Sequence, residues 1–221
     1  MAVNGLVKIK VCGVTSSSDA LGAAELGADY LGLNFYRASP RYVEPGRARA
    51  IADAVRGSSR KVSLVGVFVN STRAEVESID ESVGLDLLQF HGDEEPGFVA
   101  PFAGRAIKAF RSGGMPSPED LRAWDGVWGV LIDAPHGTLY GGTGAPWDYG
   151  RAVSDASDGA GRRLFLAGGL GPDNARRAVQ SVRPYAIDVC SRVESRPGSK
   201  DLELLRRLFQ EVRHGETQTP S

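Results

Sequence analysis

Two side chains that can move protons stand far apart in the sequence, each directly after an apolar run. Cys12 follows Val7–Val11 and precedes Gly13, and Asp133 follows Gly129–Ile132. A thiol deprotonated by a nearby cation is a base, and a partly desolvated carboxyl group holds a proton near neutrality. Each also has a structural alternative, a buried thiol for Cys12 and a loop-capping carboxylate for Asp133. The two residues predict acid–base catalysis if both runs end at one site.

Groups suited to binding anions follow other apolar runs. Arg41 stands in the stretch Ser-Pro-Arg-Tyr-Val, and a planar guanidinium can hold a carboxylate at two points, although most arginines are solvated. Gly168 and Gly169 follow the seventh run, and a further loop follows Val189. Glycine lets backbone N–H groups approach phosphate oxygens. These residues predict a site for a phosphorylated small molecule.

The runs that position these residues are short, apolar and rich in β-branched side chains. Most are too apolar for a strand with one wet face, which favours a parallel sheet covered by helices. The predicted strands are Val7–Val11, Tyr30–Asn34, Val62–Val69, Asp86–Gln89, Arg105–Ala109, Gly129–Ile132, Leu164–Ala167 and Ala186–Val189.

The intervening segments carry helix start signals. Ser16 to Asp19 and Thr72 to Glu75 have the spacing of a capping box. The dipeptides Ser117-Pro118 and Gly171-Pro172 place proline at a first helical position.

Eight β-then-α units predict an α/β protein with a single-domain (β/α)8 TIM barrel over residues 1–213. A doubly wound open sheet is the alternative, but it usually has fewer strands, and no Gly-x-Gly-x-x-Gly follows the first run. The polar tail from His214 to Ser221 is predicted to be disordered. Loops after the strands form the active face of such a barrel, which would bring Cys12 and Asp133 together.

Composition excludes several classes of protein. The net charge of −1 gives no reason to expect nucleic acid or an anionic membrane as partner. No apolar run approaches the roughly 20 residues of a membrane span, and the first residues do not resemble a secretion signal. Two cysteines and three histidines offer neither a disulfide framework nor a metal site. We expect a cytoplasmic protein with free thiols.

The motifs, taken in order, resemble the phosphoribosylanthranilate isomerase family of tryptophan biosynthesis. Each lies after a predicted strand, and the resemblance extends from Val7 to about Phe209. The motifs are KVCG, NFYRASPRYV, VFVN, QFHGDE, KAFR, LIDAPHGTLYGGTGAPWDY, LAGGLGPDN and IDVCSRVESRPGSKD.

The resemblance implies a role for each candidate residue. Cys12 becomes the general base, Asp133 the general acid, and Arg41 the partner of the anthranilate carboxylate. His91 matches a substrate-adjacent position but could equally be structural, and Asp188 matches a carboxylate near the sugar hydroxyls. The positions implied for phosphate binding are Gly142, in a flexible flap, with Gly168, Gly169, Ser191 and Arg192.

The reaction implied is an Amadori rearrangement of N-(5-phosphoribosyl)anthranilate, which needs no cofactor or metal. The expected partner is the small phosphosugar substrate, and the chain is expected as a monomer or homodimer. One alternative is the related histidine-pathway aminoaldose isomerase, which uses aspartate where Cys12 stands. Another is a non-catalytic sugar-phosphate binding protein, which would need neither an acid nor a base.

One stretch departs from the family pattern Ser-Ser-Gly-Val-Glu. This chain has Cys190-Ser191-Arg192-Val193-Glu194 in its place. If the glycine position requires positive φ, Arg192 is strained; if not, its charge should tighten phosphate binding. Cys190 is interpreted as a small packing residue in place of serine.

Overall fold

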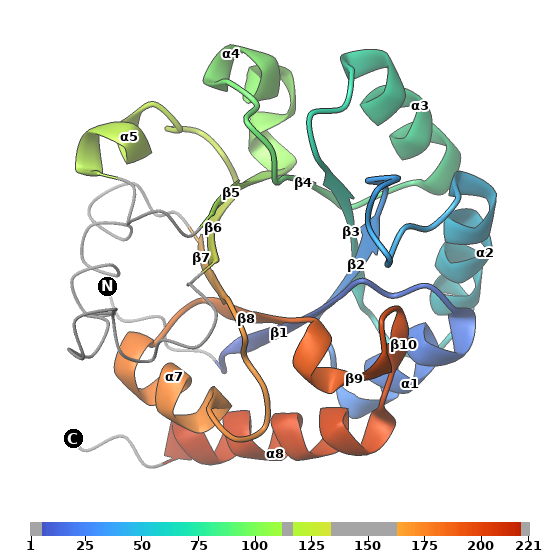
Figure 1. Cartoon of the computed structure of the whole chain (residues 1–221), viewed down its shortest axis with the longest axis vertical. Helices are drawn as coiled ribbons and strands as arrows, with labels where there is room; N and C mark the ends of the chain where they lie inside the picture. Colours follow the sequence, from blue (N-terminus) through green and yellow to red (C-terminus); the bar gives the residue numbers. More distant parts are fainter. Residues whose placement is uncertain (1–5, 112–116, 134–162, 218–221) are drawn as a thin grey trace.

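The strands of the computed structural model, which describes residues 6–111, 117–133 and 163–217, close into a barrel (Figure 1). Neighbours pair in parallel in sequence order, and the last barrel strand pairs with the first. These strands are β1 Lys8–Cys12, β2 Tyr30–Asn34, β3 Ser63–Phe68, β4 Leu87–Phe90, β5 Ala106–Phe110, β6 Gly129–Asp133, β7 Arg163–Ala167 and β8 Ala186–Val189. The predicted (β/α)8 class is confirmed, and Cys12 and Asp133 are the last residues of their strands rather than the residues after them.

Helices form a ring outside the barrel (Figure 1). Thr72 and Glu75 form a complete capping box at the start of α3, and Ser16 accepts a hydrogen bond from the backbone N–H of Asp19 at the start of α1. The helices are α1 Ser17–Leu26, α2 Pro45–Arg56, α3 Arg73–Val83, α4 Pro96–Val99, α5 Pro118–Arg122, α7 Ala175–Val182 and α8 Leu202–Thr217, with the 3-10 turns η1 Ala100–Arg105 and η2 Ser191–Val193. Within the described ranges no helix is long and apolar enough to cross a bilayer.

Two predicted boundaries are wrong. Helix α7 begins at Ala175 rather than at Pro172, because the Asn174 side chain holds the preceding loop by accepting from the Gly171 backbone N–H and donating to the Gly169 carbonyl.

The predicted tail begins too early, since α8 continues through Thr217. Glu216 binds the backbone N–H of Val7 and the guanidinium of Arg213, and these contacts hold the last turn against the start of β1. Residues 218–221 lie outside the described part of the chain.

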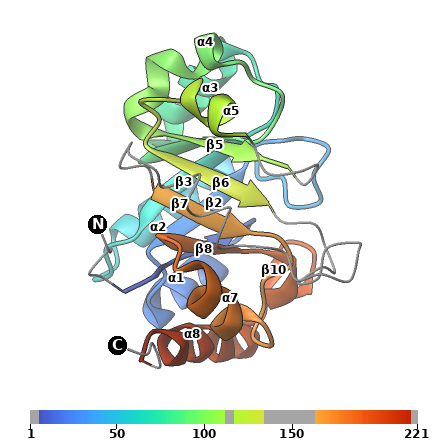
Figure 2. The ribbon, with the colours of Figure 1, turned by 90° about the vertical axis from the view of Figure 1, so that its left-hand side faces the viewer.

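Side chains along each strand point alternately outward to the helices and inward to the barrel axis, and each direction has its own buried apolar cluster. Ile9 and Val11 of β1 pack in the shell between barrel and helices, whereas Lys10 and Cys12 face the barrel axis. The strands run toward one end of the molecule, where a hairpin of β9 (Glu194–Arg196) and β10 (Ser199–Lys200) also lies (Figure 2). Inward side chains at the strand ends therefore meet beside this hairpin.

Candidate active site

A cavity of about 240 Å³ opens at the carboxyl-terminal ends of the strands. Most strands contribute their last inward side chain to its wall: Cys12, Asn34, Val67, Gln89, Asp133, Ala167 and Asp188. The loops after the strands add Ser39, Arg41, His91, Gly168, Gly169, Leu170, Cys190 and Ser191. The predicted acid and base thus share one cavity with most of the other predicted site residues. Gly142 lies outside the described residues.

Cys12 lies close to two buried lysines, Lys10 and Lys200. Lys10, two residues earlier on the same face of β1, is fully buried and donates a hydrogen bond to Asp188, with 2.9 Å from its Nζ to Asp188 Oδ1. The pKa of the Cys12 thiol is held well below its usual value by a hydrogen bond with Cys190 and, against the effect of burial, by the charges of Lys10 and Lys200. These contacts favour a thiolate at Cys12.

Asp188 is the carboxylate beside that thiol. Burial raises its pKa to about 7, although the ion pair with Lys10 opposes the shift. Asp188 is therefore ready to exchange a proton near neutral pH, beside the base.

His91, the residue after β4, lies between the side chains of Gln89 and Asp133. Its Nδ1 lies 2.9 Å from Gln89 Nε2, so with the amide oriented this way the proton of the neutral ring is on Nε2. That Nε2 lies 3.8 Å from Asp133 Oδ2. Burial holds the pKa of His91 below its usual value, so the ring is neutral at neutral pH. His91 faces Asp133 as a neutral donor rather than as a cation.

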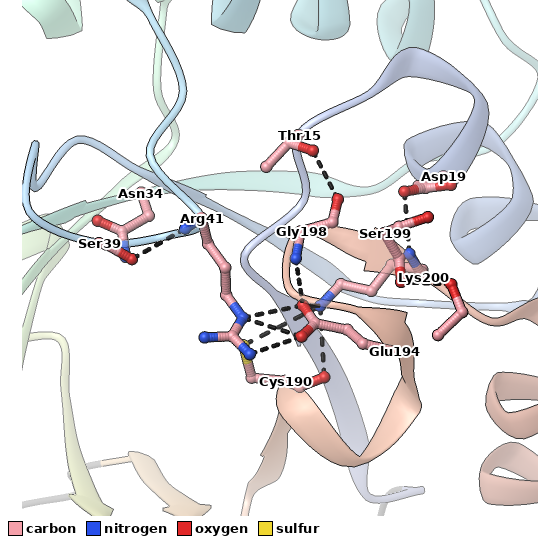
Figure 3. Close-up of polar contacts among 11 residues, drawn as sticks. Thr15, Asp19, Asn34, Ser39, Arg41, Cys190, Glu194, Gly198, Ser199 and Lys200 are labelled. Atoms are coloured by element: carbon pink, nitrogen blue, oxygen red, sulfur yellow. Dashed lines mark hydrogen bonds and ion pairs between the residues drawn. The ribbon is translucent and has the colours of Figure 1, made fainter.

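Arg41 is held by Glu194, the first residue of the hairpin (Figure 3). Nε lies 2.9 and 3.0 Å from the two carboxylate oxygens, and Nη2 lies 2.6 Å from one of them. Glu194 also accepts from Lys200 Nζ at 2.7 Å, and the side chains of both Glu194 and Lys200 are buried. Burial would raise the pKa of Glu194, but Arg41 and Lys200 hold it below the usual value. The remaining nitrogen of Arg41 points away from Glu194 (Figure 3), which leaves one edge of the guanidinium available for a ligand.

The glycine-rich turn after β7 requires its glycines. Gly168 and Gly169 have φ values of 101° and 59°, in the left-handed region that strains other residues. Asn174 holds this turn directly before α7, as described above. The backbone at these two glycines therefore lines the cavity a few residues before the N-terminus of α7, an arrangement suited to an anion.

Arg192 lies beside this turn without backbone strain. Among the described non-glycine residues, only Asn70 and Arg183 have positive φ. The Arg192 guanidinium extends along Gly171 to Asp173, with 2.9 Å between Nη2 and Oδ2. Arg192 does not line the cavity, and its charge is shared with Asp173.

Sequence reasoning missed several residues of this site. Lys10 carries the signal that could have found it, because a strand places residues two apart on one face, and Lys10 is two residues before Cys12. Gln89 has the same relation to His91. Glu194 and Lys200 carry no such local signal, since the hairpin reaches the site only in the folded chain. In the residues that the structure describes, no group of three or more histidine, cysteine or acidic side chains could hold a metal ion.

Comparison with known proteins gives consistent matches. The sequence profile described as N-(5'phosphoribosyl)anthranilate (PRA) isomerase matches residues 9–211. The chain is 44% identical over 208 residues to the N-(5'-phosphoribosyl)anthranilate isomerase of Citrifermentans bemidjiense, covering 94% of this chain and 98% of the relative. It is 44% identical over 211 residues to the enzyme of the same name from Pseudomonas aeruginosa, covering 94% and 95%.

Solved structures agree with these relatives. Phosphoribosyl anthranilate isomerase from Thermotoga maritima superposes with a TM-score of 0.79 at 34% identity, covering 95% of this chain and all of that one. A second similar structure, with a TM-score of 0.78 at 32% identity and the same coverage, holds reduced 1-(o-carboxyphenylamino)-1-deoxyribulose 5-phosphate.

Proposed function

The chain belongs to the N-(5'-phosphoribosyl)anthranilate isomerase family, and from that premise we propose which of its residues perform the reaction. It isomerises N-(5-phosphoribosyl)anthranilate to 1-(2-carboxyphenylamino)-1-deoxyribulose 5-phosphate, an aldose–ketose isomerisation (Amadori rearrangement) in the biosynthesis of L-tryptophan. The reaction needs an acid at the ring oxygen of the ribose and a base at its C2.

Asp133 is the acid of this proposal. It donates a proton to the furanose ring oxygen, and the C1–O bond breaks to leave a protonated Schiff base between C1 and the anthranilate nitrogen. Neutral His91, with its N–H facing the carboxyl group at 3.8 Å, lies where it can orient Asp133.

Cys12 is the base. Its thiolate removes the proton from C2, the electron pair forms a C1–C2 double bond, and the Schiff base becomes an enolamine that tautomerises to the ketone. The single observation that carries this assignment is geometric: Cys12 on β1 and Asp133 on β6 reach one cavity from well-separated strands, with Lys10 and Lys200 favouring the thiolate.

Two anionic groups of the substrate orient it across that cavity. The free edge of Arg41 is assigned to the anthranilate carboxylate, with the guanidinium held in place by Glu194. The phosphate is assigned to the turn at Gly168 and Gly169 together with Ser191 and Gly142, with Arg192 adding charge beside them. Asp188 is assigned to the sugar hydroxyls.

The decisive experiment is a fluorescence assay with phosphoribosylanthranilate on wild type and Cys12→Ala together. General base removal is expected to lower kcat by about 10²–10⁴-fold. Near-normal turnover of the variant would remove the thiol from the mechanism. The histidine-pathway aminoaldose serves as the control substrate and is expected to be turned over much more slowly.

The role of Arg41 has its own test. Arg41→Ala should raise KM, because orientation of the carboxylate is lost, while the fold is retained. Unchanged steady-state constants would assign the carboxylate to another group. We further propose that the barrel acts as one catalytic domain, as a monomer or homodimer, which sedimentation at the assay concentration would decide.

A further inference from the structure

The second cysteine of the chain lies beside the proposed base. Val11 and Val189 are paired across β1 and β8, so Cys12 and Cys190 occupy the next positions along two adjacent parallel chains. Both side chains also line the same cavity, so the two thiols are neighbours at its wall.

The surroundings of Cys190 determine which way its proton points. Lys200 Nζ lies 4.0 Å from Cys190 Sγ and 3.4 Å from the Cys190 carbonyl oxygen. An ammonium group donates hydrogen bonds and cannot accept them, so Cys190 Sγ is the acceptor in that contact. The S–H of Cys190 is then left to donate to Cys12 Sγ.

The distribution of charge decides which thiol is ionised. Lys200 and Arg41, the cations nearest Cys190, are both bound to Glu194, which offsets their charge. Cys12 instead lies on the same strand face as Lys10, whose partner Asp188 has a pKa raised to about 7 by burial and so offsets less positive charge than Glu194 does. Negative charge is therefore favoured at Cys12, with the proton on Cys190. The charged or titratable groups that act on Cys12 are Lys10 of β1, Arg41 after β2, His91 after β4, Asp188 of β8, Cys190 after β8 and Lys200 of β10.

We propose that Cys190 is a positioning residue, which donates its S–H to the Cys12 thiolate and so extends the pH range of the base toward acid. The inference deepens the proposed function, since it gives Cys12 a partner in the role of base. The contacts form a chain of donors from Lys200 through Cys190 to Cys12. A hydrogen bond to an ionised acceptor is stronger than one between neutral groups, which is why a weak S–H donor is effective here.

The test measures the ionisation of Cys12 directly, without substrate. Wild type, Cys190→Ala and Cys190→Ser are alkylated with iodoacetamide over a pH series in a phosphine reductant, and mass spectrometry follows the peptide containing Cys12. Cys190→Ala removes the donor, and Cys190→Ser restores one of similar size. Cys12→Ser reports the reactivity of Cys190 alone.

Cys190→Ala should move the alkylation midpoint of Cys12 upward by about one pH unit, a roughly tenfold slower reaction at a fixed pH below both midpoints. Cys190→Ser should return the midpoint to that of wild type, and Cys190 in the Cys12→Ser variant should react only at alkaline pH. The acid limb of kcat/KM should shift with the alkylation midpoint in each variant.

Two results would overturn the inference. The first is an alkylation midpoint unchanged in Cys190→Ala. The second is an equal shift in Cys190→Ala and Cys190→Ser, which would assign the effect to the sulfur atom rather than to its proton. If the midpoints move as expected but Cys12→Ala keeps its turnover, the inference about ionisation stands and the proposed function of Cys12 fails.

Discussion

Aromatic rings fill one end of the barrel interior, whereas charged groups surround a cavity at the other. At the amino-terminal end, Trp128, Phe165 and Tyr185 pack ring against ring, with centroid separations of 5.7–5.9 Å. Tyr30 and Tyr185 share a hydrogen bond of 2.7 Å between their hydroxyl groups, and Arg163 lies 4.5 Å above the ring of Trp128. The polar groups here are satisfied by one another.

At the carboxyl-terminal end, the side chains that face the barrel axis include charged and titratable groups instead of aromatic rings. Burial and charge shift the pKa values of Cys12, His91 and Asp188, and the buried Lys10 forms an ion pair with Asp188. Such an arrangement is poor for stability and good for proton transfer. The repeated β-then-α unit thus builds both a stabilising end and a reactive end of the same barrel.

The largest expected effect is a loss of activity on substitution at the cavity end of the barrel. Asp133→Asn should lower kcat by about 10²–10⁴-fold, because the amide cannot donate the proton that opens the ring. Its melting temperature should stay close to that of wild type, since the side chain is one-third exposed. Steady-state kinetics and a thermal melt of the same sample check both; retained kcat would remove Asp133 from the mechanism.

The matching change at the aromatic end should act on stability alone. Phe165 is fully buried among the rings, and Phe165→Ala should lower the free energy of unfolding by about 3–5 kcal/mol. Urea unfolding measures this loss, with Phe165→Leu as the milder control. A large fall in the kcat of the folded variant would show that the two ends are coupled.

Lys10→Met tests the buried charges beside the cavity. Asp188 would lose its cation, so its folded-state pKa, already about 7, should rise further above the unfolded value. A raised carboxyl pKa costs stability increasingly as pH climbs from the unfolded toward the folded value. The loss should therefore be larger at pH 8, where it reaches no more than about 3 kcal/mol, than at pH 5.

Urea unfolding of wild type and Lys10→Met at both pH values measures this difference. A loss independent of pH would show that Lys10 stabilises the barrel through packing of its alkyl chain rather than through Asp188.

The smallest effect concerns the cation at the aromatic end. Arg163→Met removes the charge over Trp128 and Tyr185, and we expect a loss of about 0.5–1 kcal/mol that does not vary between pH 5 and 8. Arg206→Met, which removes an exposed ion pair on α8, is the control for loss of a surface arginine. If Arg163→Met lost as much unfolding free energy as Lys10→Met, with the same dependence on pH, the aromatic end would not differ electrostatically from the cavity end.

Particular residues show where the sequence was informative. The apolar runs predicted every strand of the barrel to within one residue at each end, because burial on both faces of a parallel sheet leaves a local pattern. Cys12 and Asp133 could be identified because each stands at the end of such a run. The start of α7 could not be placed, because the contacts of Asn174 with Gly171 and Gly169 override the usual preference for proline at a first turn.

The barrel class, the strands and the residues able to do acid–base chemistry could all be predicted from the amino-acid sequence, because they depend on patterns among neighbours along the chain. The surroundings of each of these residues became known only from the folded chain. Lys10 and Asp188, 178 positions apart, meet because β8 pairs with β1, and Glu194 binds Arg41 because the hairpin folds over the strand ends. Ionisation depends on burial and on charges within a few ångströms. Lys10 is close to Cys12 through their shared strand, but Cys190 reaches Cys12 only because β8 pairs with β1, and Lys200 only because the hairpin folds over the strand ends.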